Sequence, residues 1–522
     1  MVLNPTLGTG LFIGSGQALA AGGPASLLLS FSFISVLVYC LTTAVAEISA
    51  HMPEKGGTLV THAYRYSSNH MAFSMGYLRW YSLAMLVPFE ITNAIVHVGM
   101  WIPGPAVAIR VSIITAIIFL FNLLPERAFK RSEAFFSGLK YVTTGGLAIV
   151  SVALAIRGVP GTGIRGFSYW NNPGAMNEYL ISGPAGRFLG LLQCLLYSAV
   201  SFIFQPELTV HRAEEVDSKV RPSIFSVARI DNIQLVFMYI ISAVSVGLMS
   251  PFTEPSLTNS GLGAGFSPYM IGIRNSQLPV LPIVATITIL LSSVASGRSF
   301  LYLSSRTLCT LSESGHAPAL FQARTRWGVP YVAVITSALF SGFAYLSLAT
   351  SSSVVFNWLM HFITTSGYIS WLGACVSYLQ FRRATETQGF APVYRARIQP
   401  YGAYFGIASC TLLPLINGII VAAPSQLTAS KLIPAYLGIP TYLLLYFGHQ
   451  ARDAITRRNV KTKEVSIEQG GNVVEEPSRQ DEGKFEIELP TFFPLDLDLP
   501  NLGLPDFDAE PRRPGSTRKG RT

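Results

Sequence analysis

Charged residues are scarce in this 522-residue chain, at 12% of the total, while hydrophobic residues make up 50%. A soluble domain carries about 25% charged residues, so this composition argues against an ordinary soluble enzyme. Cysteine is also rare. The five cysteines lie far apart in apolar runs, which argues against a disulfide framework and a cysteine-based zinc site. The chain has no P-loop, no HExxH motif and no visible nucleophile–base pattern, so we expect no enzyme activity and neither a cofactor nor a metal.

The charges that are present concentrate near the C-terminus, where residues 451–522 hold 12 Lys/Arg and 14 Asp/Glu. This segment is also rich in Pro and Gly and poor in aromatics, so it cannot bury enough apolar surface to fold alone. We therefore predict a membrane domain over residues 1–450 and a disordered cytoplasmic tail over 451–522, where regulatory partners can dock. The net charge of +9 does not indicate nucleic acid, because the basic residues of the body fall in short loops.

Long apolar runs dominate the rest of the chain. A membrane-crossing helix needs about 20 mostly apolar residues. Eleven such stretches occur, at 25–50, 73–100, 105–124, 137–156, 187–208, 231–250, 279–303, 330–350, 354–379, 403–423 and 432–450. A twelfth candidate at 7–21 is too short to span alone. The pattern predicts an all-α integral membrane protein embedded in a lipid bilayer.

The basic residues of the short loops indicate the orientation. If the C-terminal tail is cytoplasmic and the spans alternate, the inside loops hold 17 Lys/Arg and the outside loops six. Because cytoplasmic loops carry the excess of Lys and Arg, this split predicts that both termini are cytoplasmic.

The first interruption of the apolar pattern is rich in glycine, with Gly8, Thr9 and Gly10 followed by Gly14-Ser15-Gly16. Each glycine costs a helix about 1 kcal/mol relative to alanine, and unwound backbone survives in lipid only where it lines a protein cavity. Backbone N–H groups at such a break, with a helix N-terminus behind them, form a site for a carboxylate. Small-residue helix packing explains the same glycines equally well.

The second interruption is Phe204-Gln205-Pro206-Glu207. Pro206 removes a helical hydrogen bond, and the carbonyl of Phe202 that it frees can accept a hydrogen bond from an ammonium group. Glu207 is then a candidate for amine recognition or proton coupling, or alternatively an interfacial charge at a helix end. Interrupted segments at corresponding places in two halves of a chain indicate a transporter site near the bilayer midplane.

Three further residues are candidates for the same site. Glu90 either relays a proton or lies buried against Arg79. A mid-span arginine such as Arg298 costs about 2.5–3.5 kcal/mol, so we expect it to pair with Glu90 or Glu207, unless it lies near the end of its span and snorkels. Trp358 can close over an apolar substrate side chain, although aromatic residues in a span usually serve packing.

Several long stretches resemble the fungal amino acid permeases of the amino acid–polyamine–organocation superfamily. They include GTGLFIGSG (8–16), AEISAHMPEKGG (46–57), SSRTL (304–308), RWGVPYVAV (326–334) and VFNWL (355–359), and the similarity covers nearly all of 7–450. The resemblance implies a twelve-helix fold, a 5+5 inverted repeat plus two helices. It also implies proton-coupled uptake of amino acids across the plasma membrane. Since only residues 1–7 precede the first break, the first helix is expected to be incomplete.

The resemblance also implies where the substrate binds. Its carboxylate would meet the backbone of Gly8, Thr9 and Gly10, and its ammonium the carbonyls of Phe202, Ile203, Phe204 and Gln205. Glu207 matches the sixth-helix glutamate of the family, which implies a part in amine recognition or proton coupling. From its position in the third span, Glu90 is a second candidate for proton coupling. The chain departs from the family where Gln205-Pro206 replaces Gly-Thr and where Arg298 replaces a common Asn, which puts the substrate range in doubt. A nutrient sensor of the same fold with little transport is the alternative function.

Overall fold

The computed structural model is built from helices, and the residues that it describes contain no strand. The described residues are 11, 14–51, 58–99, 107–157, 166–203, 205–215, 223–257, 267–275, 280–348, 352–389, 395–421 and 436–468. In that part of the chain, six helices are long and apolar enough to cross a membrane. The predicted all-α membrane architecture is therefore confirmed, whereas the count of twelve spans stays a prediction.

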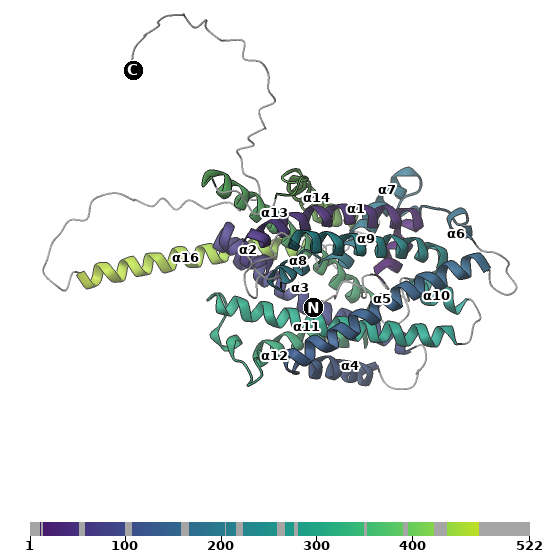
Figure 1. Cartoon of the computed structure of the whole chain (residues 1–522), viewed down its shortest axis with the longest axis horizontal. Coiled ribbons are helices and arrows are strands. Elements are labelled where there is room, and N and C mark those ends of the chain that lie inside the picture. The colour runs from purple at the N-terminus through teal and green to yellow at the C-terminus, as the bar shows by residue number, and fades with distance from the viewer. Residues whose placement is uncertain are drawn as a thin grey trace, which may run out of the picture. The chain divides into compact units, whose positions relative to one another are not determined.

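The first half of the helices consists of α1 (Ser15–His51), α2 (Leu59–Tyr66), α3 (Asn69–Gly99), α4 (Val107–Asn122) and α5 (Glu126–Arg157). The next are α6 (Ser168–Asn171), α7 (Pro184–Ala199), η2 (Val200–Phe202), α8 (Gln205–Glu215), α9 (Ser223–Met249), η4 (Pro255–Leu257) and α10 (Pro268–Arg274). The last are α11 (Leu281–Glu313), η5 (Ala319–Gln322), α12 (Tyr331–Leu339), η6 (Phe340–Leu348), α13 (Ser352–Thr387), α14 (Tyr401–Val421) and α16 (Gly438–Glu468). Figure 1 shows the long helices α1, α9 and α11 with their axes close to one direction.

A helix, or a pair of consecutive helices, occupies most of each of the eleven predicted apolar stretches. Helix α5 begins well before the predicted start at residue 137, so Lys140, which was counted among the 17 basic residues of the inside loops, lies inside this helix instead. Helix α16 continues past residue 450, and the predicted tail beyond Glu468 lies outside the described residues. The division into residues 1–450 and 451–522 stays a prediction.

Helix α1 contains a sharp kink at Gly23, whose φ of 80° lies in the left-handed region. Glycine adopts this conformation without strain, and Pro24 behind it cannot donate a helical hydrogen bond. A Cβ atom at Gly23 would come within 2.9 Å of the Ala175 carbonyl oxygen. The sequence therefore ends one helical segment at this glycine and starts the next at the proline.

A loop between α6 and α7 supplies the hydrogen bonds that the kink leaves unmade. The Ala25 N–H donates to the Ala175 carbonyl over 2.9 Å, and the Asn177 N–H donates to the Gly22 carbonyl over 2.9 Å. The Asn177 side chain donates to the Ala20 carbonyl over 2.8 Å. Buried backbone groups need such partners, so this loop is part of the structure of the kink.

The same loop carries an ordered exposed charge. The Glu178 carboxylate accepts hydrogen bonds from the Gly183 N–H and from Arg187, whose Nη2 lies 3.1 Å from Oε1. These two donors hold the pKa of the Glu178 carboxyl below its usual range, because they stabilise the ionised form.

Helices α1 and α7 approach each other closely where both carry glycine. A Cβ atom at Gly190 would lie 2.9 Å from the Ala21 carbonyl oxygen, and one at Gly22 would lie 2.8 Å from the Gly190 carbonyl oxygen. Small residues allow such backbone contact between membrane helices. Helix α3 has a central place, because it packs against α11, α13 and α16.

Candidate functional site

The predicted second interruption is present, between α7 and α8. Helix α7 ends at Ala199, a single 3₁₀ turn covers Val200–Phe202, and α8 starts at Gln205. Pro206 lies in the first turn of α8, where its missing N–H leaves no helical hydrogen bond unmade. The helix therefore changes from an α-helix to a 3₁₀ turn at the predicted place, and Pro206 belongs to the start of the second helix rather than the middle of one.

Side chains from two other helices hold the backbone of this interruption. The Tyr239 hydroxyl of α9 donates to the Ser201 carbonyl over 2.8 Å. The Trp371 indole N–H of α13 donates to the Ile203 carbonyl over 3.2 Å. Both aromatic side chains are fully buried, and Tyr239 also packs on Phe202 at a ring distance of 4.2 Å. The shape of the interruption is thus fixed by neighbouring helices.

A chain of polar side chains attaches the start of α8 to α9 and α1. The Gln205 amide donates to the Asn232 side-chain oxygen over 3.1 Å, and Asn232 in turn donates to the Thr42 hydroxyl. Thr42 completes the chain by donating to the Val38 carbonyl over 2.9 Å. All these groups are buried, where an unmade hydrogen bond costs about 1–3 kcal/mol. Gln205 therefore has a structural role in positioning the interruption.

Glu207 forms a buried ion pair with Arg79 of α3, with 3.5 Å between Oε2 and Nη2. The side chains are 5% and 2% exposed, so solvent screens this attraction little. Glu207 is therefore a buried charge with a partner on α3, and its role in amine recognition or proton coupling stays a prediction. The pair joins α8, directly after the interruption, to α3.

Arg298 pairs with Glu133 of α5, which corrects the prediction that Glu90 or Glu207 is its partner. Its guanidinium also donates to the Ser132 hydroxyl, and the Ser299 hydroxyl donates to the Glu133 carboxylate over 3.0 Å. The guanidinium carbon lies over three aromatic rings, at 4.3 Å from Phe129, 5.0 Å from Phe136 and 5.7 Å from Phe121. Arg298 is fully buried in the interior of α11, so it does not snorkel.

Lys140 and Glu90 complete this second cluster of charges. Lys140 of α5 is 2% exposed and lies close enough to Glu133 and Glu90 to interact electrostatically with both. Glu90 of α3 is also 2% exposed. Two carboxylates and two cations thus meet between α3, α5 and α11, and their formal charges cancel. Buried charges of this kind in a membrane protein mark candidate ion or proton pathways.

The structure describes the remaining predicted residues only in part. Gly8, Thr9, Gly10 and Phe204 lie outside the described residues. Phe202 and Ile203 are buried at the interruption, whereas Trp358 is 38% exposed. One aromatic residue of α13 that contacts the interruption is Trp371. The binding roles of all these residues stay predictions.

Sequence reasoning missed Tyr239, Trp371, Glu133 and Lys140. A buried hydroxyl or indole N–H needs a hydrogen-bond partner. A Tyr or Trp within a span therefore indicates that the span lies next to a backbone carbonyl able to accept a hydrogen bond. Glu133 and Lys140 lie seven residues apart in sequence and so on one face of α5. A helix that presents two opposite charges on one face within a membrane bundle needs partners on another helix.

The sequence model of the amino acid permease family matches residues 2–461 of the chain. The chain is 34% identical to a probable proline-specific permease of Schizosaccharomyces pombe over 450 residues, covering 85% of this chain and 81% of that protein. It is 34% identical over 457 residues to a proline-specific permease of Emericella nidulans, with coverage of 86% and 83%. A dicarboxylic amino acid permease of Saccharomyces cerevisiae is 30% identical over 460 residues, with coverage of 86% and 75%.

Among solved structures, the chain is similar to a mutant of a manganese transporter from Eremococcus coleocola. The TM-score is 0.54 at 14% sequence identity, and the match covers 87% of this chain and 94% of that chain. At this identity the likeness concerns the fold alone.

Proposed function

The chain belongs to the amino acid permease family, and from this premise we propose that it takes up an amino acid together with protons across the plasma membrane by alternating access. Its curated relatives are transporters rather than enzymes, and the chain is a multi-pass membrane protein. The observation that carries the proposal is the interruption between α7 and α8, with the buried Arg79–Glu207 pair directly behind it.

The substrate ammonium would bind at this interruption. Carbonyls at the 3₁₀ turn can accept hydrogen bonds from groups outside the helix, as those of Ser201 and Ile203 do. The substrate carboxylate would bind the N–H groups of Gly8, Thr9 and Gly10 at the other break. Two of the carbonyls, those of Ser201 and Ile203, already accept hydrogen bonds from Tyr239 and Trp371, so fewer acceptor positions are left for an ammonium.

We propose a neutral substrate of the proline type. A secondary ammonium such as that of proline has two N–H donors where other amino acids have three, which suits a site with few acceptor positions. The buried carboxylates Glu207 and Glu133 each face a cation of the protein, so neither is offered to a basic side chain. Arg298 is likewise engaged by Glu133 and is not offered to an acidic side chain. The relatives described as proline-specific support the same class.

Proton coupling would use Glu207, with Glu90 as a second candidate. Protonation of Glu207 removes its charge and so weakens its attraction to Arg79 of α3. Helix α8 and the interruption would then be released from α3, and deprotonation would restore the contact. In alternating access, a transporter moves between two arrangements that bind its substrate or ion with different affinity.

The topology completes the proposal. We propose that both termini are cytoplasmic, because that side carries 16 Lys/Arg once the buried Lys140 is left out, against six on the other. Regulatory proteins would then reach the segment after α16.

The test is uptake of labelled proline by permease-deficient yeast that expresses the chain, at acid and at neutral external pH. We expect faster uptake at acid pH, loss of uptake with a protonophore, and competition by neutral but not by basic or acidic amino acids. Glu207→Gln should lower pH dependence, whereas the matched surface variant Glu178→Gln should leave it unchanged. Absence of uptake with the protein confirmed at the cell surface would refute the transport proposal and favour a sensor.

A further inference from the structure

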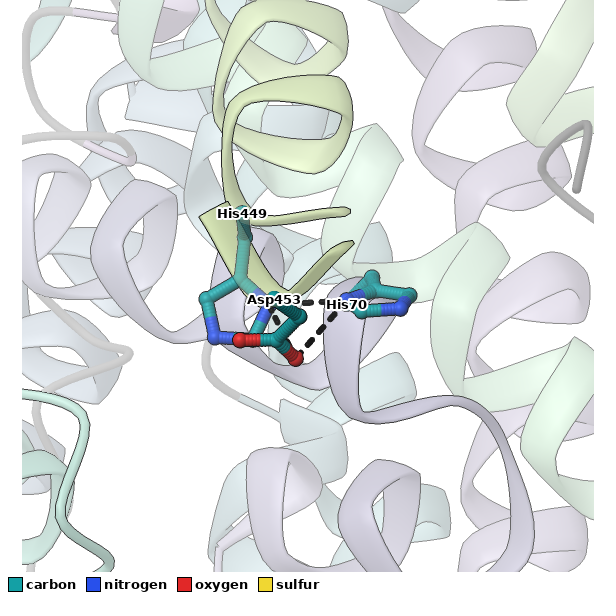
Figure 2. Close-up of side chains that lie close together, drawn as sticks. All are labelled: His70, His449 and Asp453. Atoms are coloured by element: carbon teal, nitrogen blue, oxygen red, sulfur yellow. Dashed lines mark hydrogen bonds and ion pairs between the residues drawn. The ribbon is translucent and has the colours of Figure 1, made fainter. Parts of the chain in front are cut away.

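Two imidazoles and a carboxylate meet where α16 crosses the beginning of α3. His70 lies in the first turn of α3, and His449 and Asp453 lie on α16. Residues four apart on a helix lie on one face, so His449 and Asp453 point the same way, toward His70 (Figure 2). The three side chains come from segments separated by more than 370 residues in the sequence.

The donor atoms are close together. The Nδ1 atoms of His70 and His449 are 2.8 Å apart, and Asp453 Oδ2 lies 3.8 Å from the first and 3.7 Å from the second. A tetrahedral zinc ion binds nitrogen and oxygen at about 2.0–2.2 Å, which places its ligand atoms about 3.3 Å from one another. The three observed distances lie on both sides of that value, so shifts of about half an ångström bring all three atoms to ligand positions.

Aromatic packing holds both imidazoles in place. The His449 ring stacks on Phe73 at 4.2 Å, and the His70 ring meets the edge of Tyr446 at 6.0 Å. His449 is 7% exposed, whereas the Asp453 side chain is 37% exposed and leaves a way in from solvent. Rings held in this way lose little conformational freedom when they bind a ligand, which distinguishes this cluster from mobile surface side chains.

We propose that His70, His449 and Asp453 form a binding site for a divalent transition-metal ion of the zinc class. Two imidazoles and one carboxylate are a donor set for such ions, whereas Mg²⁺ and Ca²⁺ prefer oxygen ligands alone. Three protein ligands leave one tetrahedral position for water. The positive charge of Arg452 lies near His449 and would repel a bound cation. His316 is a further polar neighbour, with its ring centre 5.4 Å from that of His449.

A bound ion would join α16 to α3 at this end of the bundle. Helix α3 carries both Arg79 and Glu90, so the ion would fix one end of the helix that contacts both buried charge clusters. Ligands that bind the folded state alone stabilise it in proportion to the logarithm of their concentration. The site does not depend on the proposed substrate or on proton coupling, and its test needs no transport measurement.

The experiment uses the full chain purified in detergent or nanodiscs after removal of metal with a chelator. Zn²⁺ is added with Mg²⁺ as the control cation, and bound metal per chain and melting temperature are measured. We expect one Zn²⁺ per chain, a higher melting temperature with Zn²⁺ only, and X-ray absorption that reports two imidazole nitrogens. His70→Gln and Asp453→Asn should each weaken Zn²⁺ binding by at least about tenfold.

Arg452→Gln is the matched control, because it changes one charge next to Asp453 and removes no ligand. It should keep or strengthen Zn²⁺ binding, the opposite of Asp453→Asn. Each variant is compared with itself in chelator and in Zn²⁺, so a loss of basal stability does not mimic a loss of binding. Failure of the parent chain to bind Zn²⁺ would overturn the proposal. Equal affinity in the parent chain and both ligand variants would do the same.

Discussion

Replacing Glu207 by glutamine separates the structural role of the Arg79–Glu207 pair from a role in coupling. At the observed 3.5 Å, two unit charges attract by about 5 kcal/mol with an effective dielectric constant of about 20. Removal of one partner of a buried pair costs about 3–5 kcal/mol, because the other charge stays buried without compensation. Since each 1.4 kcal/mol is a factor of ten, we expect Glu207→Gln to lower the ratio of folded to unfolded protein at least about a hundredfold.

The double variant Arg79→Gln/Glu207→Gln tests this reasoning. It leaves neither charge in the interior, so it should recover most of the stability that either single variant loses. Stability is read as the melting temperature of the purified protein and as the amount that reaches the cell surface. A Glu207→Gln protein as stable as the parent chain would refute the argument that the pair is a buried, weakly screened interaction.

Transport by the same double variant decides the role in coupling. If the pair only supports the structure, proline uptake and its acceleration at acid pH return together with stability. If Glu207 carries the proton, the double variant folds but its uptake no longer depends on external pH.

Four further predictions follow from contacts described above. Gly190→Ala should destabilise the protein by about 1–3 kcal/mol because its Cβ meets the backbone of α1, whereas Gly138→Ala, where the Cβ has open space, should not, as thermal unfolding will show. Arg298→Lys should lower surface expression despite keeping the charge, because lysine cannot replace a planar guanidinium over three rings; expression equal to the parent chain would contradict this. Trp371→Phe should weaken the hold on the interruption by about 0.5–1.5 kcal/mol and raise the KM for proline more than it lowers the maximal rate. The pKa of Glu178 is lowered in the folded protein, so the ionised carboxylate stabilises the loop fully above the ordinary glutamate pKa of about 4.3. This stabilisation is lost as pH falls through the lower pKa of the folded state. Hydrogen exchange at the Ala25 and Asn177 amides should therefore quicken only in strong acid.

The positions of the membrane helices were predictable from the sequence because the bilayer imposes a simple rule. A span needs a long apolar run, and eleven such runs coincide with described helices. The interruption before Gln205 was equally visible, since proline marks it in the sequence. The short helix α2 was not predicted, because its eight residues are too few to give a clear periodic pattern.

The pairing of the buried charges was not predictable. Arg298 and Glu133 are 165 residues apart, and only the packing of α11 against α5 brings them together. Lys140 was assigned to a loop because the charges before it make the start of α5 look like a connection. Sequence reasoning correctly required a carboxylate for Arg298, but it named Glu90 and Glu207 and did not consider Glu133.

The Arg298–Glu133 pair has a consequence for how the protein is made. Helix α5 is synthesised well before α11, so the carboxylate and the aromatic rings are already in the membrane when the arginine leaves the ribosome. A lone arginine disfavours insertion of a span by about 2.5–3.5 kcal/mol, and a waiting partner offsets that cost. We therefore expect α11 to insert reliably into the bilayer only when α5 is already there. The pair thus makes insertion of α11 depend on the order in which the helices are synthesised.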